Sequence, residues 1–375
     1  MPKLNLTDTY LGHTYRITSF VDVQSFDFER ELNTLLHEHN QDHPDELWEL
    51  YGQNRCHYIE NQNAGCYLIQ IKRPDSVPLT QLVIHIEQKK YLSLTSGQIK
   101  RWCQANLSQE DCEIVLKIIQ QFISQHTSLM SLRLQLFDFS PLWSLEAQKL
   151  SEKFNFKSTQ NNEYTHTRAL KLIGTDEELL ATVPPKTRAK IRHKSHENFM
   201  ITELRDFKYI PALQMAIEHS FKRSADFKIN SNFDDIMNMA IKYPEKCRII
   251  GYAKKDNPDF PLAFVVGIIG DGLCEYHMAG SLNDPELRSI PFNYLLVWNL
   301  ILWGKNSGAK LFDYGGISDE GPNDPTANIS YFKRRFPADE YKVASESLWI
   351  VSPFKWFSFL FMKKIQALTR NVISS

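Results

Sequence analysis

The sequence carries almost no net charge. It has 375 residues, and its 43 Lys and Arg nearly balance its 44 Asp and Glu, so the formal net charge is −1. A protein that binds nucleic acid over much of its surface is usually basic overall. We therefore expect no DNA partner, and any recognition of anions must be local to one part of the chain.

Cysteine and long apolar runs are also scarce. The six cysteines lie far apart, with no Cys-x-x-Cys pair and no histidine at zinc-site spacing. This pattern predicts buried, reduced thiols in a cytoplasmic protein and no metal site. No uncharged apolar run reaches the roughly 18 residues that a spanning helix needs. Residues 1–15 are polar and lack the pattern of a signal peptide.

The composition that remains is ordinary for a globular protein. Hydrophobic residues make up 42% and charged residues 23%, which excludes the disordered and low-complexity classes. At roughly 150 residues per domain, the length predicts two to three domains. Strand-like and helix-like stretches alternate along the chain, and this alternation favours an α/β (α+β) fold.

Hydrophobic periodicity predicts where these elements lie. The strands are expected at 67–72, 82–87, 132–137, 164–172, 262–269, 273–279 and 310–316, and the helices at 112–124, 145–154 and 292–304. A short echo links the two halves, because Gln135-Leu-Phe-Asp-Phe139 and Lys310-Leu-Phe-Asp-Tyr314 each follow an apolar helix. We interpret the echo as two structural copies of one α/β unit.

Residues 184–194 form the most unusual local composition. Lys186, Lys190 and Lys194 stand at a spacing of four, with Arg188 and Arg192 in the adjacent row and no acid among them. On a helix beginning after Pro185, these five cations would crowd one side and repel one another. Two interpretations follow: a binding site for a phosphate-like anion, which guanidinium groups suit, or a solvated basic face. We favour the anion site.

A second segment combines flexible backbone with cations. Leu311-Phe-Asp-Tyr-Gly-Gly-Ile-Ser318 is followed by a polar loop and then by Ile329-Ser-Tyr-Phe-Lys-Arg-Arg-Phe336. The glycine pair, Gly315 and Gly316, allows the backbone to approach a ligand closely. A lysine presented after such a loop can stabilise an oxyanion as it develops.

In this order the two segments resemble the C-terminal signature of the FemABX-like aminoacyltransferases and the related BioF2-like acetyltransferases, which share the GNAT acyltransferase fold. Glu275-Tyr-His-Met-Ala-Gly-Ser281, Pro291-Phe-Asn-Tyr-Leu-Leu-Val-Trp298 and Arg188-Ala-Lys-Ile-Arg192 follow the family's order and spacing. The resemblance is strong over residues 182–341 and weaker before them. It implies two tandem GNAT-like domains, each a mixed twisted sheet flanked by helices. We expect the domains at 1–172 and 173–342, with 343–375 packing back onto the first.

The resemblance also implies an activity. Family members transfer an acyl or aminoacyl group to an amine, here expected on a phosphate-bearing cell-envelope or peptidoglycan precursor. No Gly-x-Ser-x-Gly motif or Cys/His pair is recognisable in the chain, so we expect direct attack without a covalent enzyme intermediate. No bound cofactor is expected; the co-substrate is aminoacyl-tRNA or acyl-CoA.

Residue by residue, the resemblance assigns three catalytic positions. Lys333 would stabilise the tetrahedral oxyanion, the Phe332 carbonyl would hold the attacking amine, and Asp138 would line the acceptor site, where it or a water would take the proton. Arg223 would grip the acceptor's diphosphate together with the cations Arg188, Lys190 and Arg192. Tyr276 has a family counterpart near the active site, although a core tyrosine is an equal alternative.

The chain departs from the family pattern at two points. Pro337 and Ala338 stand where glycines usually follow Phe336. The chain also lacks the long charged helical arm that some members use towards tRNA. The stretch 280–291 has no pyrophosphate-binding turn of the kind that acyl-CoA enzymes carry. The missing turn counts against acyl-CoA as the missing arm counts against tRNA, so both donors stay open. From a different class, the chain would be a catalytically idle GNAT-like module that binds an anionic glycan, nucleotide or RNA.

Two further features have competing interpretations. His37, His39 and His43 suggest a metal site only weakly, because they straddle two faces of a polar helix end. The tail at 352–375 is aromatic and basic, with no acid. It is expected either to pack on the first domain or to contact a membrane surface peripherally, which would put the protein at the inner face of the membrane.

Overall fold

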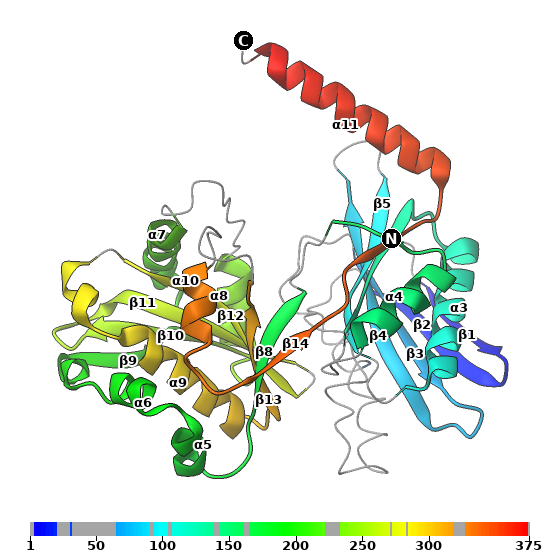
Figure 1. Cartoon of the computed structure of the whole chain (residues 1–375). Helices are drawn as coiled ribbons and strands as arrows, with labels where there is room; N and C mark the ends of the chain where they lie inside the picture. The colour runs from blue at the N-terminus through cyan, green and yellow to red at the C-terminus, as the bar shows by residue number, and fades with distance from the viewer. Residues whose placement is uncertain are drawn as a thin grey trace. The chain divides into compact units, whose positions relative to one another are not determined.

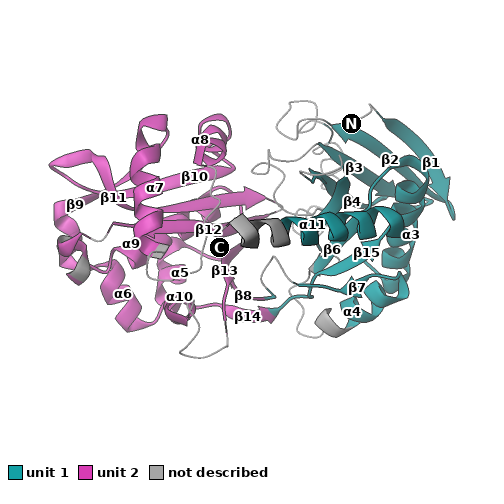
Figure 2. Cartoon of the chain, turned by 90° about the horizontal axis from the view of Figure 1, so that it is seen from above, with its two compact units in different colours: residues 1–165, 342–375 teal, residues 166–341 magenta. Residues whose placement is uncertain are grey.

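The computed structural model of the chain describes residues 4–20, 31, 65–89, 94–103, 107–137, 143–160, 165–221, 233–270, 272–282, 284–318 and 327–373. The chain divides into two compact units, shown in different colours in Figure 2. Unit 1 comprises residues 1–165 and 342–375, and unit 2 comprises residues 166–341. Each unit is built on one mixed β-sheet.

The sheet of unit 1 has the strand order β1-β2-β3-β4-β5-β6-β15-β7. Its strands are β1 (Asn5–Tyr10), β2 (His13–Phe20), β3 (Cys66–Lys72), β4 (Pro78–Gln88), β5 (Thr95–Cys103), β6 (Ser131–Phe137), β7 (Lys157–Ser158) and β15 (Ser347–Ile350). All neighbours are antiparallel except β5 and β6, which run parallel. A parallel pair needs a crossover connection, and helix α3 (Gln109–His126) provides it.

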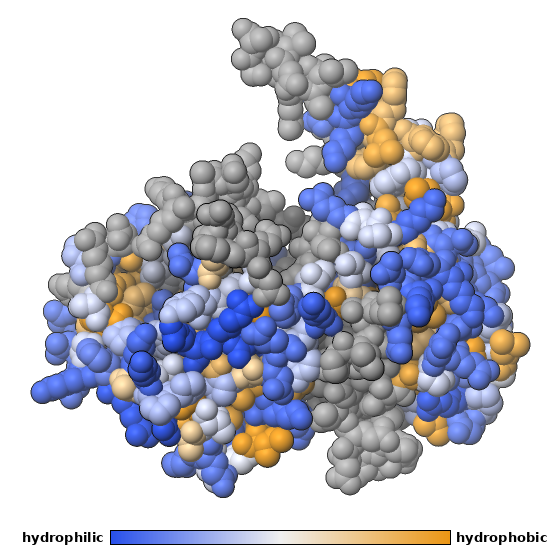
Figure 3. Space-filling model, in the orientation of Figure 1, coloured by the Kyte–Doolittle hydropathy of each residue, from blue (hydrophilic) through white to orange (hydrophobic). Residues whose placement is uncertain are grey.

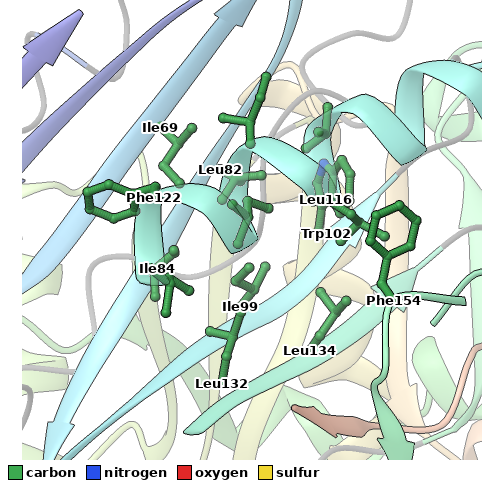
Figure 4. Close-up of a cluster of buried hydrophobic side chains, with 14 of the residues drawn as sticks. Ile69, Leu82, Ile84, Ile99, Trp102, Leu116, Phe122, Leu132, Leu134 and Phe154 are labelled. Atoms are coloured by element: carbon green, nitrogen blue, oxygen red, sulfur yellow. The ribbon is translucent and has the colours of Figure 1, made fainter. Parts of the chain in front are cut away.

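Helix α3 forms at the position that its apolar spacing predicts. A capping box opens it, because the Ser108 hydroxyl accepts from the Asp111 N–H while the Asp111 carboxylate accepts from the Ser108 N–H. Its apolar face packs on the sheet, where Leu116 and Phe122 lie among strand side chains (Figure 4). Helix α4 (Trp143–Lys153) follows β6.

The sheet of unit 2 has the order β14-β8-β13-β12-β11-β10-β9. Its strands are β8 (His166–Lys171), β9 (Phe199–Glu203), β10 (Cys247–Lys254), β11 (Asn257–Gly270), β12 (Leu273–Ser281), β13 (Leu311–Gly316) and β14 (Asp339–Lys342). Strands β12 and β13 are parallel and are connected through helix α9 (Phe292–Asn306). A Cβ on Gly267 of β11 would lie 2.3 Å from Leu300 Cδ1, so the glycine allows α9 to pack closely on the sheet.

The other helices of unit 2 are short (Figure 1). They are α5 (Asp176–Thr182), α6 (Pro185–Ile191), α7 (Ile210–Phe221), α8 (Phe233–Lys242) and α10 (Ala327–Lys333), with 3-10 turns at Lys194–Asn198, Phe207–Tyr209 and Pro285–Ser289. The chain ends in α11 (Pro353–Ile373), which belongs to unit 1. Among the helices that the structure describes, none is both long and apolar enough to cross a bilayer.

The two sheets repeat one topology. In unit 1, β3, β4 and β5 are antiparallel neighbours, and α3 then leads to β6 parallel to β5. In unit 2, β10, β11 and β12 are antiparallel neighbours, and α9 leads to β13 parallel to β12. The echo between residues 135–139 and 310–314 therefore marks equivalent strands, β6 and β13. The α/β fold class with a mixed sheet in each half is confirmed.

The strand predicted at 164–172 was assigned to the first domain, and that assignment is wrong. It forms β8, which pairs antiparallel with β13 in unit 2, where Leu170 lies opposite Phe312. The equivalent place beside β6 in unit 1 is taken by β15, which pairs antiparallel with β6 and β7. The alternation of a strand's side chains shows which face is buried but not which sheet edge it joins, so the sequence does not reveal this arrangement.

Candidate active site

Lys333 ends helix α10 and points its side chain into unit 2. Only 7% of the residue is exposed. Its Nζ donates a hydrogen bond to the carbonyl oxygen of Gly316 at 2.7 Å and lies 5.5 Å from the ring centroid of Tyr276 on β12. Lys333 therefore lies beside two other predicted site positions, Tyr276 and Gly316.

The glycine pair at the end of β13 has a conformational reason. Gly315 has φ of +72°, a region that residues with a side chain rarely adopt. A Cβ at this position would lie 3.4 Å from the Tyr276 carbonyl oxygen and 3.5 Å from Lys333 Nζ. The turn thus brings the Gly316 carbonyl to the lysine and leaves room for its ammonium group.

A buried carboxylate lies behind the glycines. Asp313 is fully buried, and its Oδ1 accepts hydrogen bonds from Thr167 Oγ1 at 2.5 Å and from the Gly315 N–H at 2.7 Å. The second bond fixes the start of the glycine turn. The carboxylate also attracts the Lys333 ammonium electrostatically, so it contributes to placing the lysine.

Burial changes the acid–base behaviour of Lys333. Removal from water lowers the pKa of its ammonium to about 8, and the negative charge of Asp313 opposes this change. At neutral pH the ammonium form still predominates. A positive charge in a nearly dry site interacts more strongly with a developing negative charge than it would in water. The side chain can therefore act as an electrostatic catalyst, and it can lose its proton more readily than an ordinary lysine.

Arg168 on β8 holds the end of helix α10. Its Nη1 donates to the carbonyl oxygen of Lys333 at 3.3 Å, and its Nη2 donates to that of Ala338 at 2.8 Å. Its Nε lies 3.5 Å from Glu340 Oε1. The guanidinium therefore ties together the backbone on both sides of residues 334–337.

Phe332 belongs to an aromatic cluster beside the lysine. The Tyr294 ring of α9 meets Phe332 edge-on, with 5.0 Å between centroids, and stacks on Phe336 at 5.7 Å. The Phe332 carbonyl oxygen accepts the N–H of Arg335 at 3.0 Å. A carbonyl oxygen has two lone pairs, so the Phe332 oxygen can accept a second hydrogen bond besides the one within the turn.

Lys190 connects the basic segment to this cluster. Its Nζ donates to the Tyr294 hydroxyl at 3.1 Å and lies 4.5 Å from the centroid of the same ring. Thr187, one turn earlier on α6, is buried and donates its hydroxyl to the Arg335 carbonyl oxygen at 3.0 Å. The short helix is thereby attached to the backbone that follows Lys333.

The predicted arrangement of five cations on one helix is wrong. Helix α6 ends at Ile191, and Arg192 is its C-cap. His193 then takes an extended conformation and its ring Nδ1 accepts from the Ser195 N–H at 3.3 Å, which starts the 3-10 turn that contains Lys194. Of the remaining candidates, Lys190 and Arg192 are exposed, and the half-buried Arg188 donates to the Ala181 carbonyl oxygen at 3.4 Å.

Two of the predicted positions lie outside the described residues. These are Asp138, the expected acceptor-site carboxylate, and Arg223, the expected diphosphate ligand. His37, His39 and His43 lie outside them too. In the described part of the chain, no three His, Cys, Asp or Glu side chains gather as a metal site requires.

The sequence analysis missed four residues that shape the site: Asp313, Thr167, Arg168 and Tyr294. Asp313 carried a signal, because a carboxylate between two aromatic residues in an apolar strand needs a partner when buried. Arg168 carried none, since the carbonyl it contacts lies 165 residues further along the chain. Thr167 and Tyr294 are ordinary residues of a strand and a helix until the fold places them.

By sequence, neither the protein-family models nor the curated proteins include a match to the chain. By structure, it is similar to FemX, with a TM-score of 0.62 and 12% identity over 76% of this chain and 88% of that one. It is also similar to a tandem GNAT protein of clavulanic acid biosynthesis, with a TM-score of 0.47, 10% identity, and coverage of 90% and 99%. A third similar structure is L-PGS of Bacillus licheniformis, with a TM-score of 0.41 and 15% identity over 71% of this chain and 79% of that one.

The likeness to FemX shows that the chain has the FemX fold. The expected architecture of two tandem GNAT-like domains is confirmed, and so is the resemblance to FemABX-like proteins at the level of the fold. At this identity the comparison concerns the fold, and the chemistry has to be argued from the residues of the site.

Proposed function

We propose that the protein is an N-acyltransferase. It would move an acyl or aminoacyl group from an activated donor to an amine of a phosphate-bearing cell-envelope precursor such as a peptidoglycan precursor. The observation that carries the proposal is the buried Lys333, whose Nζ contacts the Gly316 carbonyl and the Tyr276 ring. The FemX fold supports the same class of reaction.

Lys333 supplies the electrostatic part of the mechanism. When an amine attacks an ester or thioester carbonyl, negative charge develops on the carbonyl oxygen. The Lys333 ammonium has three protons and gives one to Gly316, so others remain to donate to the oxyanion. Because the lysine is already desolvated and anchored, little reorganisation is needed as the charge forms.

The neighbouring groups orient the reactants in this proposal. The free lone pair of the Phe332 carbonyl accepts an N–H of the attacking amine and directs its own lone pair at the donor carbonyl. Tyr276 and the glycine pair form the surface against which the donor carbonyl lies. The proton released by the amine goes to Asp138 or to a water, as the sequence analysis expects.

The exposed cations of the basic segment serve the acceptor. Lys190 lies on the Tyr294 ring that contacts Phe332, so a phosphate held by Lys190 would be tethered on the same aromatic cluster as the reacting amine. Arg188, Arg192 and Arg223 would add guanidinium donors, which pair well with phosphate oxygens. We place the protein in the cytoplasm, at the inner face of the membrane, where such a precursor is made.

The donor stays open between aminoacyl-tRNA and acyl-CoA. Titration calorimetry with acetyl-CoA and with aminoacyl-tRNA separates the two. Incubation of the protein with the bound donor and a diphosphate-bearing peptidoglycan precursor, followed by mass spectrometry, then tests the reaction. The proposal predicts a precursor heavier by one acyl or aminoacyl group. Binding of both substrates without any product would contradict it.

A second candidate function rests on the same cations. A catalytically idle module would use Lys190 and its neighbours to hold an anionic glycan, nucleotide or RNA. It predicts tRNA affinity that falls steeply with salt concentration and no product with any donor. The low pKa of Lys333 favours the enzyme, because a solvated phosphate-binding surface does not require a lysine to be buried.

A further inference from the structure

Helix α11 exposes a row of large apolar side chains. The exposed fractions are 82% for Phe354, 68% for Phe357, 65% for Phe361, 41% for Leu360 and 40% for Ile365. Spacings of three and four residues place them on one side of the helix. Figure 3 shows orange, hydrophobic atoms exposed along α11. Isolated apolar residues are common on protein surfaces, whereas a continuous aromatic row indicates a binding surface.

The start of α11 is attached to unit 1. The chain enters the helix with the N–H groups of Val351 and Ser352 both donating to the Met130 carbonyl oxygen at 3.0 Å. Lys355 Nζ, in the first turn, donates to the Ser128 carbonyl oxygen at 2.8 Å. Trp356 and Phe359 are partly buried and contact each other with 5.9 Å between ring centroids. Trp356 and Phe359 therefore cover each other in part, and the exposed row is the apolar surface of the helix that has no such cover.

The charges on the helix have a single sign. Residues 353–373 contain no Asp or Glu, and Lys363 and Lys364 are exposed. Lys364 lies three residues after Phe361 and four after Leu360, so on a helix it stands within the apolar row. A lysine among apolar side chains can lay its methylene stem along them and extend its ammonium beyond them.

We propose that this face of α11 binds the surface of a bilayer that contains anionic lipid. Phenylalanine and leucine side chains enter the boundary between headgroups and acyl chains, and Lys364, which stands within the row, reaches the lipid phosphates. The helix would lie in the plane of the interface, with its apolar row towards the lipid. This inference deepens the proposed function, because it names the surface that would hold the protein at the membrane, and it uses no residue of the candidate active site.

A second copy of the chain fits the surface less well. Pairing two α11 faces would bring the Lys364 side chains of the two helices towards each other. Since residues 353–373 offer no carboxylate to pair with them, the like charges would repel. An anionic bilayer matches both the apolar row and the lysines.

The test is cosedimentation of the full chain with vesicles. One set contains phosphatidylglycerol mixed with phosphatidylcholine, and the other contains phosphatidylcholine alone. The proposal predicts binding to the mixed vesicles that weakens with added salt. Binding to the neutral vesicles should be much weaker. The double variant Phe357→Ser/Phe361→Ser should bind about 100-fold more weakly. The variant Lys363→Gln/Lys364→Gln should lose about 25-fold.

Matched controls come from exposed residues elsewhere. Ile173 is 72% exposed and Lys149 is exposed on α4, so Ile173→Ser and Lys149→Gln should leave vesicle binding unchanged. All these side chains are exposed, and circular dichroism confirms that the variants fold. Absence of binding to mixed vesicles, equal binding to neutral ones, or full binding by the Phe357→Ser/Phe361→Ser variant would overturn the proposal. So would a wild-type dimer that this variant converts to a monomer without any vesicle binding.

Discussion

Lys333 Nζ lies 2.7 Å from the carbonyl oxygen of Gly316, which stands 17 residues before it in the chain. The contact joins the end of a short helix to the end of the strand that precedes the loop. It exists because Gly315 adopts a positive φ and because Arg168 holds the helix end from the other side. The lysine is therefore buried and anchored before any substrate arrives.

Replacing Lys333 with methionine should make the protein more stable at neutral pH. The folded-state pKa of Lys333 is about 8 against an ordinary 10.5, so burial penalises the ammonium form. The variant removes that penalty and loses one hydrogen bond, and we expect the free energy of unfolding at pH 7 to rise by about 1–2 kcal/mol. Chemical denaturation measures the change, and Lys149→Met, at an exposed position, should be neutral.

The stability difference between the wild type and Lys333→Met should also depend on pH, which tests the effect of burial on the lysine independently. Between pH 8 and 10.5 the unfolded chain holds the Lys333 proton while the folded protein has released it. The stability of the wild type therefore rises through this window relative to the Met variant. We expect the advantage of Lys333→Met to shrink from pH 8 upward, to disappear at about pH 9 to 9.5, and to reverse by pH 10.5, where the lost hydrogen bond makes the variant the less stable protein. A constant difference across this range would show that burial does not disfavour the charge.

The rate of transfer should fall as the pH rises above about 8. The proposed mechanism uses the ammonium form of Lys333, and the lowered pKa places its loss near this pH. The pH profile of kcat/KM, measured with saturating donor, should show a descending limb there. A value of kcat/KM that rises over the same pH range would instead indicate that neutral Lys333 acts as the base.

Arg168 should act as a positioning residue. The variant Arg168→Met leaves the carbonyl oxygens of Lys333 and Ala338 without their donor, and we expect a loss of about 2–3 kcal/mol in stability. Because the helix end moves and the substrate-binding cations do not, kcat should fall about tenfold while KM stays nearly constant. Arg205→Met, at an exposed arginine paired with Glu203, should change neither constant. A change in KM alone would contradict this role.

Gly315 and Gly308 form a matched pair for testing the turn. Both have positive φ, +72° and +86°. A Cβ on Gly308 meets nothing within 4 Å, whereas one on Gly315 reaches Lys333 Nζ and the Tyr276 carbonyl oxygen. Substitution by alanine should cost each variant about 1–2 kcal/mol of stability. Only Gly315→Ala should also lower the transfer rate. Equal activities in both variants would show that the turn at Gly315 does not contribute to the active site.

The parts of the fold that were predictable are those with strong local patterns. The apolar run at 262–269 and the helix at 292–304 are so hydrophobic that burial decides their structure, and they form β11 and α9. The end of α6 was not predictable in this way. His193 caps the next turn through its own ring, a local contact that competes with the helix and removes Lys194 from the expected row.

The site itself was predictable only where its residues lie close in sequence. The glycine pair and Lys333 lie within about 20 residues of each other, in motifs that follow the order of the FemABX-like signature, so the resemblance identified them together. Arg168 and Thr167 come from a strand that the sequence analysis placed in the other domain, and their contacts depend on β8 pairing with β13. Such long-range pairing follows from the whole sheet and leaves no signature in the strand.

The most direct test of the account is a single-turnover transfer assay that compares the wild type, Lys333→Ala and the exposed-lysine control Lys149→Ala. Mass spectrometry follows the precursor after mixing with loaded enzyme, and circular dichroism confirms that each variant is folded. We predict that the wild type and the Lys149→Ala control add the acyl group at the same rate. Lys333→Ala should be slower by about 100-fold to 1,000-fold, the effect of removing one oxyanion donor. Transfer by folded Lys333→Ala at the wild-type rate would contradict the account.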